Sequence, residues 1–279
     1  MIRYAPCKIN LGLRIQGKRP DTYHEIDSCF LPLKSPCDIL TIAPHSGNGL
    51  LLESRGFDIG GGENILFRTY RLLDSWFPHF PALSVCLEKN IPIGAGLGGG
   101  SSDAAALLLY AKETFGLDED SIRKIALQVG ADVPFFLTNE PSRVQGIGER
   151  IERCSHSLSG YVLLLLVPPF SSNTALAYRR YDMLERHALT NEPFHFTLRF
   201  SQYEISWNCH NDLEEAVFPL FPELPRIKRS LLEMGALASA MSGSGSSIYG
   251  IFSAYDLKKA QNIAERFQKD GNQAYVSVL

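Results

Sequence analysis

Residues 92–103 of the chain read Pro92-Ile93-Gly94-Ala95-Gly96-Leu97-Gly98-Gly99-Gly100-Ser101-Ser102-Asp103. This glycine-rich stretch stands directly before the apolar run Ala104-Ala105-Ala106-Leu107-Leu108-Leu109, which predicts a helix. Free N–H groups and the positive end of the helix dipole would meet where the loop joins the helix. Glycines let the backbone approach an anion closely and adopt positive φ. The stretch therefore predicts a binding site for a polyphosphate.

Two other glycine-rich phosphate loops differ from this one. A Walker A loop needs Gly-Lys-Ser/Thr at a fixed spacing, which is absent here. Gly94, Gly96 and Gly99 do satisfy G-x-G-x-x-G, but a dinucleotide-binding fold also needs a strand soon after the helix. The next apolar residues have helical spacing instead: Ile122, Ile125, Ala126 and Val129. This argues against a Rossmann oxidoreductase and leaves a plain glycine-rich turn, with Asp103 in the first helical turn, as the structural alternative.

Composition narrows the classes of protein to consider. A chain of 279 residues suits two domains, and a net charge of −3 favours neither nucleic acid nor an anionic membrane as partner. The longest apolar run, residues 161–167, is too short to span a bilayer, and the N-terminus has no signal-peptide pattern. The six cysteines are scattered without metal-binding spacing. We therefore expect reduced cysteines and a cytoplasmic location.

The pattern along the chain predicts an α+β protein with two domains, 1–155 and 156–279. Alternation predicts strands at 2–15, 26–33, 38–43 and 83–88, and helical spacing begins at Ile65 after a glycine-rich turn at 58–63. The second unit is expected to begin with a buried strand at 161–167. Helices are expected at 174–186, 213–218, 222–234 and 256–269, and strands at 248–252 and 273–278. Residues 189–206 give no clear pattern.

Three charged or polar residues could carry chemistry. Lys8 and Asn10 are two residues apart in a predicted strand, so they share a face. If that face lines a cleft, an ammonium and an amide converge there; otherwise Lys8 is an edge residue with its ammonium in water. Asp132 stands among small and apolar residues before Pro134. It could accept a proton from a substrate hydroxyl, or it could cap a helix.

Two further segments could recognise a ligand. Tyr23 offers a stacking face and His24 a polar edge for a nucleobase, although both could simply belong to a surface turn. Residues 242–247 form a second glycine–serine loop. Its N–H groups could hold an anion, or the loop could be a tight connection between a helix and a strand.

In order along the chain, these pieces resemble the GHMP small-molecule kinases. The resemblance rests on the N-terminal lysine strand, the loop at 92–102 and the Gly-Ser-Gly at 243–245. Within that superfamily the chain is most similar to the branch whose acceptor is a cytidine-diphosphate-linked polyol of isoprenoid synthesis. The motifs that indicate this branch are residues 5–11, 19–24, 130–135, 146–149 and 211–214. The resemblance implies an ATP-dependent kinase with its active site in a cleft between an N-terminal ATP-binding domain and a C-terminal substrate-binding domain.

The resemblance also implies roles for individual residues. It makes Asp132 the catalytic base and Lys8 its charged partner. It assigns ATP binding to Asn64, Ile65, Pro92, Gly94, Gly96, Leu97, Gly98, Gly99, Gly100, Ser101 and Ser102. It assigns substrate binding to Asn10, Tyr23, His24, Asp132, Tyr178, Gly243, Ser244 and Gly245. Tyr23 and Tyr178 would grip a cytosine ring from opposite faces while His24 reads its polar edge.

Some expectations stay open at this point. ATP is the expected co-substrate with Mg²⁺, for which Ser102 is the candidate ligand. Thr22 stands where the family usually has glycine, which we interpret as a tolerated change in a turn. One alternative is a mevalonate or homoserine kinase, against which Tyr23 and His24 argue. The other is a nucleotide-binding protein without activity, against which Lys8 and Asp132 argue. The expected partners are small molecules, with no nucleic acid or membrane, and the expected state is a monomer or weak homodimer.

Overall fold

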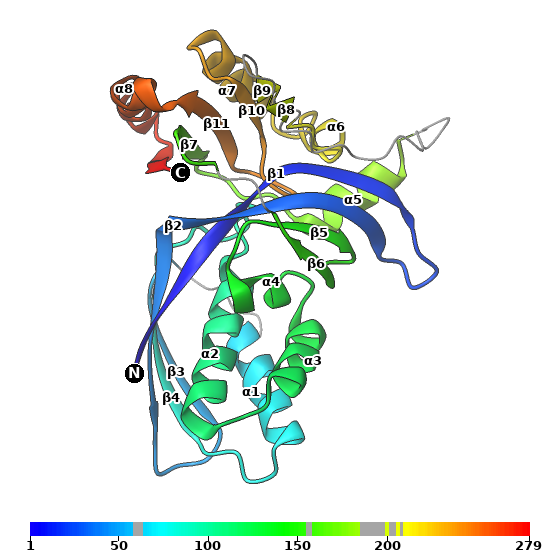
Figure 1. Cartoon of the computed structure of the whole chain (residues 1–279), viewed down its shortest axis with the longest axis vertical. Helices are drawn as coiled ribbons and strands as arrows, with labels where there is room; N and C mark the ends of the chain where they lie inside the picture. The colour runs from blue at the N-terminus through cyan, green and yellow to red at the C-terminus, as the bar shows by residue number, and fades with distance from the viewer. Residues whose placement is uncertain (58–63, 155–157, 185–198, 201–204, 207–208) are drawn as a thin grey trace.

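The computed structural model describes residues 1–57, 64–154, 158–184, 199–200, 205–206 and 209–279. In this part of the chain the strands form two main sheets, which lie one above the other in Figure 1. The first sheet contains β1 (Ile2–Lys18), β2 (His24–Pro44), β3 (Leu50–Gly56), β4 (Leu83–Lys89), β5 (Ser142–Gly146) and β6 (Arg150–Arg153). Its order is β3-β4-β2-β5-β6, with β1 paired to β2, and only β3 and β4 are parallel.

The long hairpin of β1 and β2 corrects the strand prediction. Two strands were expected at 26–33 and 38–43, but β2 is one strand of 21 residues. The break is absorbed by a register shift: Pro6 pairs with Cys37, while the next residue of β1, Cys7, pairs with Leu33. A bulge of this kind inserts extra residues without ending the pairing. The hairpin therefore runs past the first sheet and along the second half of the molecule (Figure 1).

Four helices cover one face of the first sheet (Figure 1): α1 (Ile65–Trp76), α2 (Gly99–Phe115), α3 (Glu119–Val129) and α4 (Val133–Thr138). Side-chain caps set two of their starts, since Asn64 accepts from the N–H of Leu66 and Asp118 from that of Ser121. The apolar faces of the helices share a core with β2 and β4. The expected helix after α2 is confirmed. Among the described residues, no parallel strand follows the glycine loop as a Rossmann fold requires.

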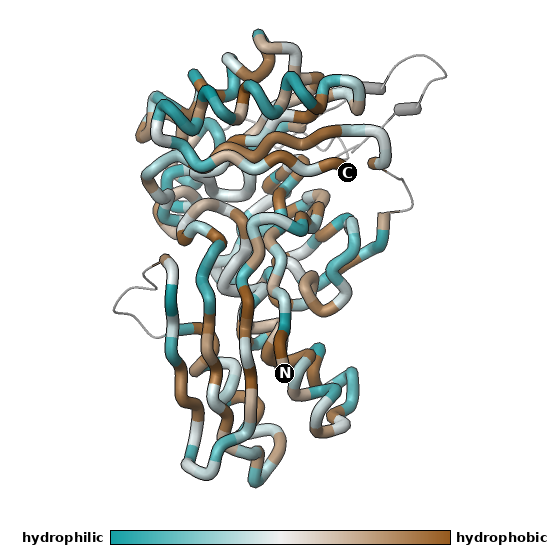
Figure 2. The backbone as a smooth tube through the Cα atoms, turned by 90° about the vertical axis from the view of Figure 1, so that its left-hand side faces the viewer, coloured by the Kyte–Doolittle hydropathy of each residue, from teal (hydrophilic) through white to brown (hydrophobic). Residues whose placement is uncertain are grey.

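The second sheet is antiparallel, in the order β10-β11-β7-β12. Its strands are β7 (Tyr161–Val167), β10 (Ala238–Met241), β11 (Ile248–Ser253) and β12 (Gln273–Val278). The helices of this half are α5 (Thr174–Asp182), α6 (Glu214–Val217), α7 (Glu223–Glu233) and α8 (Leu257–Lys269), after the short η1 (Ala254–Asp256). The short strands β8 (Arg199–Phe200) and β9 (Ile205–Ser206) form a separate two-stranded sheet. In Figure 2 the strands of the second sheet are mostly hydrophobic below the more hydrophilic helices.

The described part of the chain is therefore α+β, as expected. The turn expected at 58–63 and most of residues 189–206 lie outside the described residues. No helix within the described ranges is long and apolar enough to cross a membrane.

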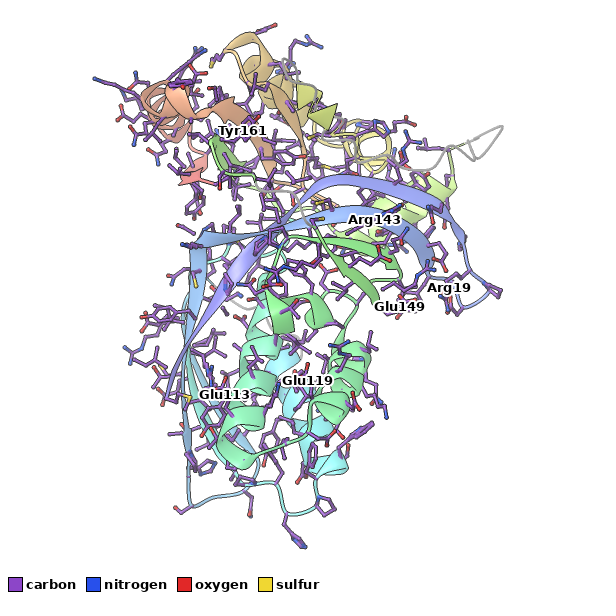
Figure 3. The ribbon with its side chains drawn as sticks, in the orientation of Figure 1. Arg19, Glu113, Glu119, Arg143, Glu149 and Tyr161 are labelled. Carbon is purple, nitrogen blue, oxygen red and sulfur yellow. The ribbon has the colours of Figure 1, made fainter. Side chains whose placement is uncertain are left out.

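Polar ties hold the hairpin where the site is built. Arg143 on β5, labelled in Figure 3, donates two hydrogen bonds to the buried carboxylate of Asp27 on β2, at 2.9 and 2.6 Å. Such bidentate pairs fix geometry as well as contribute energy. Burial of the Asp27 side chain, which is 0% exposed, makes this tie part of the core.

Candidate active site

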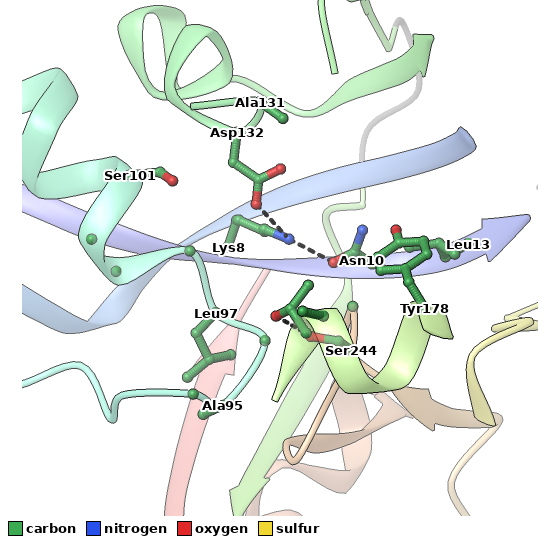
Figure 4. A pocket seen from close by; sticks show the side chains of 18 of the residues that line it. Lys8, Asn10, Leu13, Ala95, Leu97, Ser101, Ala131, Asp132, Tyr178 and Ser244 are labelled. Carbon is green, nitrogen blue, oxygen red and sulfur yellow. Dashed lines mark hydrogen bonds and ion pairs between the residues drawn. The ribbon is translucent and has the colours of Figure 1, made fainter. Parts of the chain in front are cut away.

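A cleft of about 890 Å³ brings together the residues predicted for ATP and acceptor binding. It is bordered by β1, the loop before α2, the start of α4, α5 and the second glycine loop (Figure 4). The predicted residues that line it are Lys8, Asn10, Tyr23, His24, Asn64, Ile65, Pro92, Gly94, Gly96, Leu97, Gly98, Gly99, Gly100, Ser101, Asp132, Tyr178, Gly243 and Ser244. Two predicted residues, Ser102 and Gly245, do not line it.

The loop before α2 has the backbone that a phosphate cradle needs. Gly94, Gly96 and Gly98 adopt φ values of 67°, 75° and 70°, which residues with a Cβ rarely take. Gly98 is the N-cap of α2 and makes no side-chain cap, so the N–H groups of the first turn carry no side-chain acceptor from the cap residue. The helix is 17 residues long, and its dipole points its positive end at the loop.

The second glycine loop packs directly on the first. The Ser242 hydroxyl donates to the carbonyl of Gly96 at 2.9 Å, and the Ser247 N–H donates to the carbonyl of Ala95 at 3.1 Å. The close approach requires glycine, because a Cβ on Gly96 would overlap the carbonyl oxygen of Ser242. On the other side, the Lys8 N–H donates to the carbonyl of Leu97 at 2.9 Å. The phosphate loop is thus held between β1 and the C-terminal half of the chain.

Lys8 and Asp132 face each other across the cleft (Figure 4). Their charged groups lie 3.3 Å apart, and the Lys8 ammonium also donates to the Asn10 side-chain oxygen at 2.7 Å. Lys8 is only 4% exposed and lies over the Phe30 ring, so the edge-strand alternative is wrong. Asp132 directly precedes α4, but its side chain caps no N–H, so the capping alternative is wrong as well. The pair places a carboxylate and a buried cation beside the phosphate loop.

Asn64 and Ile65 lie at the cleft edge where α1 begins. The Asn64 side chain is engaged there, because it accepts from the Leu66 N–H at 2.8 Å as the cap of α1. Its position at the cleft therefore has a structural cause besides any contact with a nucleotide.

The far end of the cleft carries the aromatic residues. His24 stacks on Tyr178, with ring centroids 4.8 Å apart and planes 28° apart. Tyr23 is 58% exposed. One face of the Tyr178 ring is therefore covered by His24 and is not open to a cytosine ring in this structure. Burial, with the Asp132 charge adding to it, raises the pKa of Tyr178, so its hydroxyl stays protonated at neutral pH.

Thr22 has a backbone conformation that would suit glycine. Its φ is 73°, in the left-handed region that a β-branched residue adopts only at a cost. The turn is closed by the Arg19 N–H, which donates to the Tyr23 carbonyl at 2.7 Å. The change is accommodated with backbone strain beside the aromatic end of the cleft.

A buried ion triad of Lys89, Asp38 and Asp103 lies beside the phosphate loop and was not predicted from the sequence. Lys89 pairs with Asp38 and, at 2.7 Å, with Asp103, and all three are at most 5% exposed. Asp38 also accepts from the Asn90 and Ile91 N–H groups at 2.6 and 2.7 Å, at the start of the loop. Burial raises the pKa of Asp103. Charged residues flanking the glycine stretch, Lys89 before it and Asp103 after it, were the available signal.

Comparisons with known proteins identify the family of the chain. The family model for the GHMP kinases N terminal domain matches residues 64–140, and that for the GHMP kinases C terminal matches residues 204–273. A 4-diphosphocytidyl-2-C-methyl-D-erythritol kinase of Lawsonia intracellularis is 41% identical, over 90% of this chain and 88% of its own length. One from Bacteroides fragilis is 38% identical, over 91% and 92% of the two chains.

Solved structures of kinases match the chain over all or nearly all of its length. A 4-(cytidine 5'-diphospho)-2C-methyl-D-erythritol kinase matches with a TM-score of 0.77 and 32% identity, covering 99% of this chain and 98% of the other. A homoserine kinase from Cytophaga hutchinsonii matches with a TM-score of 0.73 at 16% identity, over 100% and 94% of the two chains, which shows the shared fold alone. The chain belongs to the 4-diphosphocytidyl-2-C-methyl-D-erythritol kinase family of the GHMP kinases.

Proposed function

We infer that this chain transfers the γ-phosphoryl group of ATP to the hydroxyl at position 2 of 4-diphosphocytidyl-2-C-methyl-D-erythritol, in the non-mevalonate route to isoprenoid precursors. The observation that carries this is the Lys8–Asp132 pair, 3.3 Å apart, in one cleft with the glycine loop at the start of α2. Phosphoryl transfer depends mostly on positioning and on stabilising charge on the transferring group. The cleft supplies both.

In this proposal Asp132 accepts the proton of the acceptor hydroxyl as the new O–P bond forms, while the bond from the γ-phosphorus to the bridging oxygen breaks and ADP leaves. The Lys8 ammonium, 3.3 Å from that carboxylate, steadies the charge that develops beside it. Asn10, which is held by Lys8 and donates to the Ser28 hydroxyl at 2.9 Å, contacts the acceptor. The N–H groups from Gly94 to Ser101 hold the phosphates of ATP, while the Ser102 N–H donates to the Gly98 carbonyl at 2.9 Å within α2. Asn64 and Ile65 border the adenine.

The aromatic end of the cleft supports a cytosine-bearing acceptor. Tyr23 offers an exposed face for stacking, and His24 and Tyr178 lie beside it in the cleft lining. The loop at Gly243, Ser244 and Gly245 closes the cleft from the second half, where Ser244 is tied to Thr174 by a hydroxyl contact of 2.8 Å. Mevalonate and homoserine have no base that would use the aromatic side chains.

Mg²⁺ belongs to the proposal as the ion that accompanies ATP. Ser102 does not itself line the cleft, but its hydroxyl is buried in the first turn of α2 and has no hydrogen-bond partner among the residues described. It fits a metal ligand, with water and phosphate oxygens completing the coordination as Mg²⁺ usually requires. The ion would share the charge of the transferring group. A net charge of −3 supports small molecules rather than nucleic acid as partners. The proposal also includes a cytoplasmic location and a monomer or weak homodimer.

A transfer assay with ATP against the cytidylylated polyol, mevalonate and homoserine tests the function. We expect phosphorylation of the first alone. Asp132→Asn should lower its rate by about 10²–10⁴, because an amide cannot take the proton, while ATP still binds. Asp120→Asn removes an exposed carboxylate on α3 and is the matched control, expected at the parent rate. Near-parent turnover by the folded Asp132→Asn protein would contradict the assignment of the base.

A further inference from the structure

Asp182, the last residue of α5, joins both strands of the long hairpin at the aromatic end of the cleft. One carboxylate oxygen lies 2.6 Å from the His24 Nε2 at the start of β2. The other accepts from the Lys18 ammonium at the end of β1, also at 2.6 Å. Asp182 lies one helical turn after Tyr178, so the same face of α5 supplies the stacking ring and the carboxylate.

These contacts leave the His24 ring little freedom. Its face lies on Tyr178, and its edge meets Tyr181 at a centroid distance of 6.4 Å and an angle of 85°. An ionised carboxylate only accepts hydrogen bonds, so the nitrogen that faces it, Nε2, must carry a proton. The Lys18 ammonium pairs with the same carboxylate and balances its charge. Burial works to raise the pKa of Asp182, but the hydrogen bonds from Lys18 and His24 outweigh it and lower the pKa, which keeps the acceptor ionised.

In a neutral imidazole the second nitrogen is then an acceptor. No hydrogen bond to the Nδ1 of His24 occurs within the described ranges of the chain, and His24 lines the cleft. Cytosine presents an amino group, a hydrogen-bond donor, where uracil presents a carbonyl oxygen. An acceptor at Nδ1 would bind the amino group of cytosine and repel the carbonyl oxygen of uracil.

We propose that Asp182 is a positioning residue that sets the tautomer of His24, so that Nδ1 accepts from the amino group of the acceptor's cytosine and excludes uracil. The inference rests on the proposed function and deepens it. Asp182 lines the cleft, but its two oxygens are engaged by Lys18 and His24, so in this proposal it acts through the ring it holds. Its removal should therefore change the choice of base and leave the phosphoryl transfer itself intact.

The test compares two acceptors that differ only in the base, the cytidine and uridine diphosphate esters of methylerythritol. For Asp182→Ala we expect the KM of the cytidine ester to rise about tenfold, since one neutral hydrogen bond is lost, with kcat and the KM of ATP within about twofold. The preference for cytosine over uracil should fall by a similar factor. Asp182→Asn, which keeps the shape and an acceptor oxygen, should restore part of it.

Glu25→Gln is the matched control, because Glu25 follows His24 but pairs with Arg19 and Arg150 at 3.4 and 3.3 Å. Its base preference should equal the parent's. An unchanged preference in folded Asp182→Ala would overturn the inference. Nitrogen NMR of the parent gives a readout that needs no variant: a proton on Nδ1 of His24 instead of Nε2 would overturn it too. If the parent fails to phosphorylate the cytidine ester at all, the proposed function fails first.

Discussion

Gly96 is the position where the two glycine loops come closest, and Gly96→Ala tests that contact. A Cβ there would overlap the carbonyl oxygen of Ser242 and lie 3.0 Å from its carbon and 3.2 Å from the nitrogen of Gly245. All three atoms belong to the main chain, so no flexible side chain can move aside. The φ of 75° adds strain for any residue with a Cβ.

The expected loss of stability follows from these two terms. A non-glycine residue in the left-handed region costs about 1–2 kcal/mol. Forcing apart two packed main-chain segments costs about 1–3 kcal/mol. The sum, about 2–5 kcal/mol, is less than the stability of many folded domains, so the variant should fold but melt roughly 5–15 °C lower. Its affinity for ATP should fall because the loop has moved.

Gly100→Ala is the matched control for stability. A Cβ on Gly100 meets only the Ile65 side chain at 3.7 Å, and the residue lies within helix α2. Alanine should therefore stabilise the helix by about 0.5–1 kcal/mol. Denaturant and thermal unfolding of both variants, with ATP titrated by calorimetry, measure the effect. Equal melting temperatures for Gly96→Ala and the parent would refute the close packing of the loops.

Three further predictions concern the cleft. Lys8→Met should lower turnover by about 10²–10³, because Asp132 loses its only described cation partner, and steady-state kinetics decide it. Thr22→Gly should raise the free energy of unfolding by up to about 1 kcal/mol, because the relief of strain at positive φ exceeds the entropy that glycine loses on folding. A variant that unfolds at lower urea concentration than the parent would contradict the strain. Tyr23→Ala should raise the acceptor KM about five- to hundredfold and Tyr23→Phe should not, with the KM of ATP unchanged in both; an equal loss for both substrates would assign Tyr23 to the turn alone.

The parts of the site predicted from sequence are those with a local signature. The phosphate loop follows from glycines next to a helix start, and the convergence of Lys8 and Asn10 follows from the two-residue period of a strand. The continuous strand β2 was missed because Lys34, Ser35 and Pro36 look like a turn, whereas they form a bulge within the strand that leaves no trace in the pattern.

Contacts between distant parts of the chain could not be predicted from the sequence. Asp182 bonds to His24 across 158 positions, and Lys89 bonds to Asp38 across 51. No periodicity links such residues, and their pairing depends on how β2 lies beside α5 and β4. The stacking partner of His24 is equally remote, so the division of roles between Tyr23 and His24 could only be assigned by analogy.

The boundary near residue 155 separates the strands of the two sheets, but the active site is not divided there. The Ser242 hydroxyl accepts from the Asn10 N–H at 3.2 Å and donates to the Gly96 carbonyl at 2.9 Å, so one buried oxygen connects β1, the phosphate loop and the second glycine loop. A shared apolar core also contains Ile9 of β1 and Tyr249 of β11. Because these contacts hold the phosphate loop from both sides, the first 155 residues alone would lose one wall of that loop. If the proposed function holds, ATP binding and acceptor binding both require the whole chain.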